Sequence, residues 1–152
     1  MSLPRFVTTA ASQAPEEPDR PEVCELWGVD YSALIYAAAA SCAGAPDDQA
    51  ILRFAAQRGV PARDIEKRRP LVRSNPPGGA RRRSSALRED GVRYVRGEAA
   101  EVLPLCPGDA GGAEEAASRM AERGLRVLAV ATGSSEREAN LTLWGLIGLS
   151  AG

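Results

Sequence analysis

The sequence contains no histidine and few aromatic residues, and both absences limit its chemistry. None of its 152 residues is His, and Phe, Trp and Tyr together make up 5%. Histidine is the commonest general base and a frequent metal ligand, so Ser-His and Cys-His catalysis and most zinc sites are excluded. No nucleophile has an evident base partner, which argues against a free-standing small hydrolase.

Cysteines and long apolar segments are also scarce. Cys24, Cys42 and Cys106 are widely spaced, which predicts reduced thiols rather than a disulfide framework or a metal site. The longest apolar run, at 33–40, is Ala-rich and far shorter than the roughly 18 to 20 residues that span a bilayer. The opening MSLPRF lacks the features of a secretory signal. We therefore expect a soluble chain that does not itself contact the membrane.

The numbers of positively and negatively charged residues are nearly equal. Lys plus Arg number 19 and Asp plus Glu 20, for a net charge of −1. This balance gives no overall attraction to nucleic acid, so none is expected as a partner, and any anion site must be local. The run Arg81–Arg83 could attract an anionic ligand non-specifically, but it is interpreted first as a solvated loop surface. The length of the chain predicts one domain.

Turn-forming residues divide the chain into a lead-in and a folded part. Residues 1–22 are predicted to be a flexible lead-in, with a possible first strand at 4–9, because 10–22 is rich in Pro and acidic residues. Residues 23–152 are predicted to form the single domain. Two packed helices are expected within 29–44, capped by Asp30 or Ser32, and within 45–60.

The second half alternates between strand and helix patterns. Strands are expected at 70–74, 82–87 and 92–97, the last two joined by a hairpin turn. Helices follow within 97–106 and 112–124, and two further strands at 125–132 and 140–149 complete the pattern. This order predicts an α/β (α+β) fold with a mainly antiparallel sheet flanked by two helical hairpins.

In this order the segments resemble the nucleotide-binding (N) domain of P-type cation-transporting ATPases, pumps of the haloacid dehalogenase-like superfamily. The resemblance covers about 31–149 and rests on five motifs in series. They are PDDQAILRFA for the family's acid-rich turn and helix, VRSNPPGGARRRSS for PF(D/N)xxxKR, VRGEAAEVLPLC for KGAPExxLxxC, GLRVLAVA for GxRVLAVA, and LWGLIGLSAG for LxGLxGxxDP.

The resemblance implies an ATP-binding domain that presents ATP to a phosphorylation domain. Neither the family's DKTGT phosphorylation motif nor its GDGxND magnesium loop occurs in this chain, so it is not expected to be catalytic by itself. Magnesium would act in the full-length hydrolase. The partners of this domain would be ATP and the phosphorylation and actuator domains of the same parent chain. The parent protein would be an integral membrane protein with this domain on the cytoplasmic side, and the chain would continue past Gly152 into the phosphorylation domain.

Five candidate nucleotide-binding residues follow from the resemblance. Arg96 takes the position of the family's Lys in KGAPE, and Gly97 would let the backbone approach the ligand. Arg126 would offer a fork of donors to a phosphate. Asp48 lies near the acidic position that touches the adenine amino group, and Ser74 falls where the family has its adenine-stacking Phe.

Departures from the family pattern leave a second interpretation open. Ser74 cannot replace an aromatic face, although Tyr94 is a substitute to consider, and Glu98 would repel a polyphosphate unless it turned outward. Arg126 could instead pair with a nearby acid such as Glu122 or Glu136, and the carboxylates at the start of the second helix also suit a helix N-terminus. The alternative is a degenerate structural or regulatory module of a pump-like membrane protein, one that binds no nucleotide.

Overall fold

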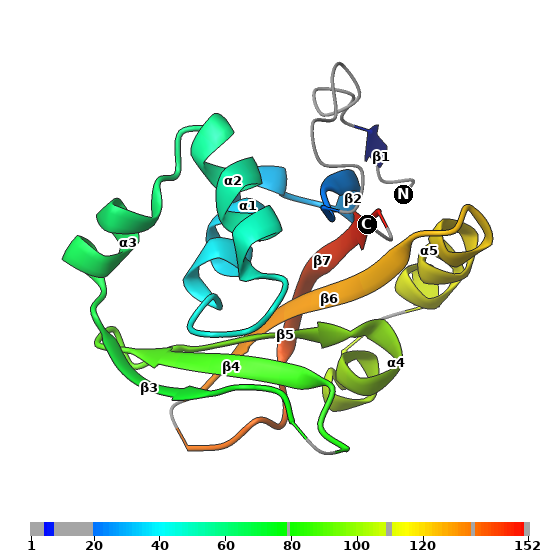
Figure 1. The fold of residues 1–152 in the computed structure, drawn as a ribbon. Coiled ribbons are helices and arrows are strands. Elements are labelled where there is room, and N and C mark those ends of the chain that lie inside the picture. The colour runs from blue at the N-terminus through cyan, green and yellow to red at the C-terminus, as the bar shows by residue number, and fades with distance from the viewer. Residues whose placement is uncertain (1–4, 8–19, 79, 109–110, 135, 151–152) are drawn as a thin grey trace.

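A single antiparallel sheet organises the chain. The computed structural model describes residues 5–7, 20–78, 80–108, 111–134 and 136–150. All neighbouring strands pair antiparallel in a seven-stranded sheet with the order β1-β2-β7-β6-β5-β4-β3 (Figure 1). The strands are β1 (Arg5–Val7), β2 (Val23–Gly28), β3 (Leu71–Asn75), β4 (Arg83–Arg88), β5 (Arg93–Glu98), β6 (Arg126–Gly133) and β7 (Thr142–Leu149).

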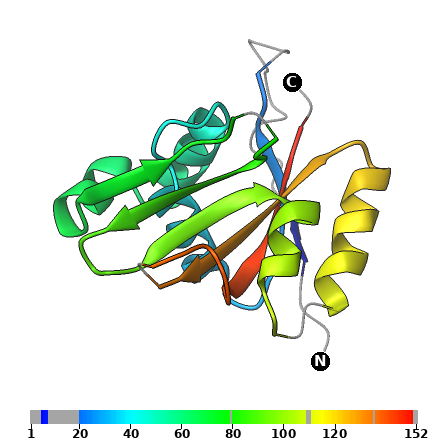
Figure 2. The same cartoon turned by 90° about the horizontal axis from the view of Figure 1, so that it is seen from below.

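Helices cover both faces of this sheet, so the fold has three layers. One group contains α1 (Tyr31–Ala40), α2 (Asp48–Gln57) and α3 (Ala62–Arg68). The other contains α4 (Ala99–Val102), the 3-10 turn η2 (Leu103–Leu105) and α5 (Gly111–Glu122). Figure 2 shows the sheet running between the two groups. We refer to the two faces as the α1–α2 face and the α4–α5 face.

Strand alternation fills a separate core on each face. Leu128 and Val130 of β6 pack in the cluster that includes α1 and α2, whereas Val127 and Ala129 pack in the cluster that includes α4 and α5. This is the period of two expected when both faces of a strand are buried. It also fixes which side chains of β4, β5 and β6 can meet above each face.

Helix α1 is the most buried helix, and its two ends are held differently. At its start Asp30 accepts a hydrogen bond from the amide of Ala33 at 3.0 Å, the capping that the sequence predicted. Beyond its end, Arg88 of β4 donates to the carbonyl of Ala40 at 2.8 Å and pairs with Glu66 of α3 at 2.7 Å. Arg88 therefore ties α1 and α3 to the sheet.

The fold class predicted from the sequence is confirmed: the protein is α+β with an antiparallel sheet. The predicted helices and strands of the second half are present, and α5 is followed by Gly124 in the left-handed region at φ 83°. Strand β2 and helix α3 were not predicted. The lead-in at 8–19 lies outside the described residues, while β1 falls within the range 4–9. Within the described part of the chain, no helix combines the length and apolar character needed to cross a bilayer.

Candidate functional site

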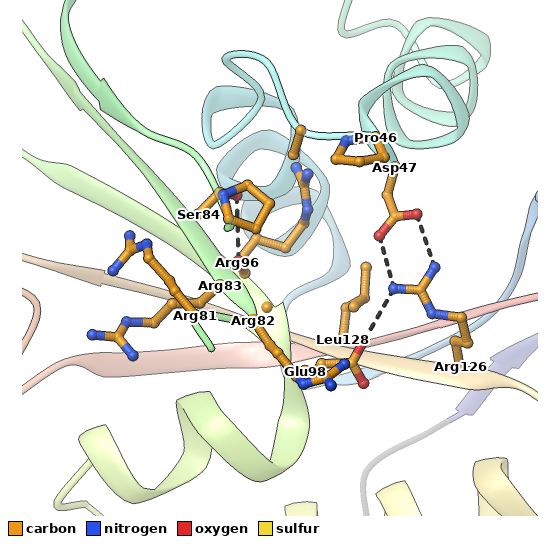
Figure 3. A pocket seen from close by; sticks show the side chains of 13 residues that line it. Pro46, Asp47, Arg81, Arg82, Arg83, Ser84, Arg96, Glu98, Arg126 and Leu128 are labelled. Carbon is orange, nitrogen blue, oxygen red and sulfur yellow. Dashed lines mark hydrogen bonds and ion pairs between the residues drawn. The ribbon is translucent and has the colours of Figure 1, made fainter. Parts of the chain in front are cut away.

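A pocket of about 370 Å³ opens on the α1–α2 face, at one end of β4, β5 and β6. Its walls come from the loop before α2, the loop between β3 and β4, and the three strands themselves. Arg96, Gly97 and Arg126, three of the five predicted residues, line it. Figure 3 shows Arg96 and Arg126 among the lining side chains. We call it the β5–β6 pocket. The predicted residues Asp48 and Ser74 do not line it.

Arg96 lies at the bottom of the β5–β6 pocket, and its charge is used within the protein. Its side chain is 2% exposed and pairs with Asp48 at 2.5 Å. The guanidinium also donates to Ser41 Oγ at 2.8 Å and to Cys42 Sγ at 3.1 Å. Burial raises the pKa of the Cys42 thiol to about 12, even though the Arg96 charge opposes this rise. Arg96 thus joins the end of α1 and the start of α2 to β5.

Asp48 is the partner of Arg96, and its carboxylate is fully occupied by the protein. Besides Arg96, it accepts hydrogen bonds from the backbone amides of Gly44 at 2.7 Å and Ala45 at 2.9 Å. These contacts shape the loop before α2 and leave no oxygen directed toward an adenine amino group. Asp48 therefore has a structural role here, and the adenine contact that the family resemblance implies stays a prediction.

Arg126 crosses the mouth of the β5–β6 pocket and is held by two carboxylates. It donates to both oxygens of Asp47, at 2.9 and 3.0 Å, and to Glu98 at 3.0 Å. Figure 3 shows the two carboxylates converging on this one guanidinium. The hydrogen bonds to Asp47 raise the pKa of Arg126, partial burial opposes this, and Glu98 adds to the rise. The acids that pair with Arg126 are thus not Glu122 and Glu136, the two the sequence suggested.

Gly97 lines the β5–β6 pocket, but atoms of the neighbouring strand fill the space beside its Cα. A Cβ at this position would lie 2.5 Å from Arg83 Cβ, 2.6 Å from Arg83 Cα and 2.7 Å from the carbonyl oxygen of Arg82. The glycine therefore permits β4 to approach β5 closely. The close approach that the structure shows at Gly97 is that of β4, and the approach of a ligand to this residue stays a prediction.

Replacing Gly97 by alanine is expected to lower the free energy of unfolding by about 2 kcal/mol, because backbone atoms of β4 would have to move. Urea unfolding of the variant tests this, with Gly108→Ala as the control. A Cβ at Gly108 meets no atom within 4 Å, so that change is expected to be close to neutral. Equal stability of the Gly97→Ala variant and the unmodified protein would contradict this prediction, because it would show that β4 can move away from β5 at no cost in stability.

The three consecutive arginines between β3 and β5 have different environments. Arg81 forms a two-pronged pair with Glu138, at 2.9 and 2.7 Å, and Arg83 binds Glu138 at 2.6 Å and Glu101 of α4 at 2.5 Å. The exposed Arg82 lines the β5–β6 pocket, and its guanidinium has no ion pair within the described residues. The interpretation as a purely solvated run was therefore wrong for Arg81 and Arg83.

The β5–β6 pocket offers an apolar wall without an aromatic ring. Pro46, Pro77 and Leu128 line it, and none of the described lining residues is aromatic. Ser74 pairs with Ala86 in the sheet, while Pro77, further along the same connection, reaches the pocket. Tyr94 is buried against α1 and donates its hydroxyl to Asp90 at 2.7 Å, so it provides no substitute stacking surface in the pocket.

Taken together, positive charge exceeds negative charge in the described lining of the β5–β6 pocket. Its described lining includes five arginines and the two carboxylates Asp47 and Glu98. No cluster of three or more potential metal ligands occurs among the residues that the structure describes. In comparisons with known proteins, no protein-family model matches the chain, and no curated protein matches it at a significant level.

Sequence reasoning missed three features of this site. Arg82 was considered only together with its two neighbours, as a loop surface with a non-specific attraction for ATP as the alternative. The carboxylates Glu101 and Glu138, which bind Arg81 and Arg83, were not considered. Glu138 follows β6 and lies far along the chain from the loop it binds, so no local pattern could indicate the contact. The available signal for the exposed Arg82 was the tripeptide Arg81–Arg83, because side chains alternate in direction along an extended segment, so the middle arginine points away from the other two.

Proposed function

We propose that this chain is the ATP-binding domain of a P-type cation-transporting ATPase and holds ATP in the β5–β6 pocket. The observation that carries the proposal is the convergence of Arg96, Gly97 and Arg126 on one pocket. These residues come from two different motifs of the family resemblance, and the exposed Arg82 joins them. In this proposal the domain presents the γ-phosphate to an aspartate of a phosphorylation domain.

The chemistry of the pocket supports a particular orientation of the ligand. Arg82, whose charge is uncompensated within the described residues, is the natural contact for the phosphates. Pro46, Pro77 and Leu128 would provide the apolar surface for the base. Without a stacking ring, we expect weak binding with a Kd near 1 mM, about 4 kcal/mol of binding free energy. Magnesium would be held by the ATP and the phosphorylation domain.

A second candidate function is supported by how fully the pocket's own charges are paired. Asp48 neutralises Arg96, Asp47 and Glu98 neutralise Arg126, and β4 occupies the space beside Gly97. A protein that keeps the fold but binds no nucleotide would show this pattern. Such a domain would act as a structural or regulatory module within a larger membrane protein.

Arg82 provides the test that separates the two candidates. Substitution Arg82→Ala is expected to weaken ATP binding about tenfold, because it removes a charge-assisted contact worth roughly 1.5 kcal/mol. Isothermal titration calorimetry at constant ionic strength measures the change. Arg63→Ala is the matched control, since Arg63 is an exposed arginine of α3 and should leave the affinity unchanged.

Two results would count against nucleotide binding in this pocket. If the unmodified domain takes up no ATP at several millimolar, the structural or regulatory module becomes the better account. If ATP binds but Arg82→Ala and Arg63→Ala lower the ATP affinity equally, binding reflects a general electrostatic attraction to arginine rather than contacts in this pocket.

A further inference from the structure

A second arginine-lined depression lies on the opposite face of the same strands. It has a volume of about 350 Å³. Arg73 comes from β3, Arg93 from β5 and Arg137 from the connection between β6 and β7, and Arg81 and Arg83 form its border with the loop that also lines the β5–β6 pocket. We call it the arginine depression.

Strand register places the arginine depression on the α4–α5 face. Arg73 pairs with Leu87 and Asn75 with Ser85, and Arg93 of β5 pairs with Leu87 from the other side. Side chains of directly paired residues point to the same face. Val95, two residues after Arg93, packs in the α4–α5 core cluster, so Arg73, Asn75 and Arg93 share that face. Arg96 and the β5–β6 pocket lie on the other face.

Positive charge exceeds negative charge in the arginine depression. Five guanidinium groups and two carboxylates line it, a formal excess of three positive charges among the described lining residues. One carboxylate, Glu138, is only 8% exposed and already accepts hydrogen bonds from Arg81, Arg83 and Ser85. Glu136 is the other and is exposed. The excess is therefore carried mainly by Arg73 and Arg137, while Arg93 donates a hydrogen bond to Ser85 Oγ at 3.4 Å.

The accessibility of these three arginines differs in a way that suits a bound anion. Arg93 is 5% exposed, so its charge is fixed at the base of the depression by the fold. Arg73 and Arg137 are exposed at its edge, and neither guanidinium makes a hydrogen bond or ion pair within the described part of the chain. One buried cation and two exposed cations can contact a compact anion from several directions.

We propose that the arginine depression binds a polyphosphate group, the chemistry found in inorganic pyrophosphate and in the phosphate chain of a nucleotide. Guanidinium forks match phosphate oxygens in pairs, and one phosphate chain carries enough negative charge to balance the excess. The convergence of three chain segments on one shallow depression favours a compact group over an extended acidic peptide. The arginine depression shares Arg81 and Arg83 with the β5–β6 pocket but lies on the other face of the sheet, and its existence does not depend on the proposed function.

The test is a titration of the domain with inorganic pyrophosphate, followed by amide NMR at constant ionic strength. It is performed in the Arg82→Ala background, so that binding in the β5–β6 pocket contributes little. Saturable shifts are expected at Arg73, Ser85, Arg93 and Arg137. The double variant Arg73→Ala/Arg137→Ala is expected to weaken this binding at least about tenfold, since two charge-assisted contacts are lost.

A matched double variant controls for general electrostatics. Arg63→Ala/Arg68→Ala removes the same charge from exposed positions of α3 and should leave the pyrophosphate affinity unchanged. Absence of saturable shifts at the four residues would overturn the proposal, as would equal weakening by the two double variants. Titration of the unmodified domain with ATP distinguishes the two sites. If ATP causes no shifts at Asp47 and Gly97 but does cause them at the arginine depression, only the proposed function is contradicted.

Discussion

Replacing Arg96 by methionine is expected to lower the free energy of unfolding by about 3 to 5 kcal/mol. Methionine can fill much of the same space, but it leaves Asp48 as a buried carboxylate without its cation, and breaking such a pair is costly. Arg96 is 2% exposed and Asp48 lies 2.5 Å from it, so solvent cannot replace the lost partner directly. Ser41 and Cys42 lose a donor in the same step.

Urea unfolding monitored by circular dichroism measures this change, and Arg126→Met is its control. Arg126 also pairs with carboxylates, but its side chain is 43% exposed, and ion pairs of this kind contribute about 1 kcal/mol or less. The midpoint should therefore fall far more for Arg96→Met than for Arg126→Met. Similar small losses in both variants would show that Arg96 does not hold α1 and α2 to the sheet.

Acidification is expected to remove about 3 kcal/mol of stability through Glu138. Burial opposes ionisation of this carboxylate, but hydrogen bonds from Arg81, Ser85 and Arg83 outweigh burial and lower its pKa from 4.5 to about 2. Because the pKa is lower in the folded state, the unfolded chain binds more protons between these two values. The contribution of Glu138 is therefore complete above about pH 5 and declines as the pH falls toward 2.

The variant Glu138→Gln isolates this contribution. Its stability should lie below that of the unmodified protein at pH 6, and the difference should narrow as both are measured at successively lower pH. Glu114→Gln, which alters an exposed residue of α5, should instead give a curve parallel to that of the unmodified protein. A constant difference for Glu138→Gln down to about pH 3 would mean that its carboxylate is not ionised preferentially in the folded state.

Most elements of the fold could be predicted because their patterns are local. Asp30 caps α1, Gly124 follows α5, and the apolar residues of β6 and β7 form unbroken runs. Strand β2 was missed because Glu25 interrupts its apolar pattern. That residue is 3% exposed and pairs with Arg123, close in space but far along the chain. Helix α3 was missed because Ile65 is its only buried residue.

The candidate site was predicted less completely because its contacts join distant parts of the chain. The family resemblance placed Arg96, Gly97 and Arg126 in one site, and the pocket contains all three. It could not indicate that Asp47 and Glu98 engage Arg126, or that Asp48 is committed to Arg96. Such pairings depend on which strand faces meet, and a shift of one residue in register would reverse them.

The β5–β6 pocket and the arginine depression share a single structural element. The loop before β4 carries Arg81 and Arg83 toward Glu138 and Glu101, and leaves Arg82 beside the β5–β6 pocket. The amide of Arg82 is also held by Glu101 at 3.0 Å, so α4 fixes the position of this loop. One clamped segment therefore determines the charge presented on both faces of the sheet.

An amide NMR titration with ATP and with AMP tests the central claim, that the β5–β6 pocket binds a nucleotide, most directly. We predict saturable ATP shifts at Asp47, Arg82, Gly97 and Arg126, weaker shifts with AMP because it lacks the outer phosphates, and loss of affinity in Arg82→Ala. Absence of shifts at these four residues at millimolar ATP would contradict this claim. So would equal responses to ATP and AMP in both the unmodified domain and the Arg82→Ala variant.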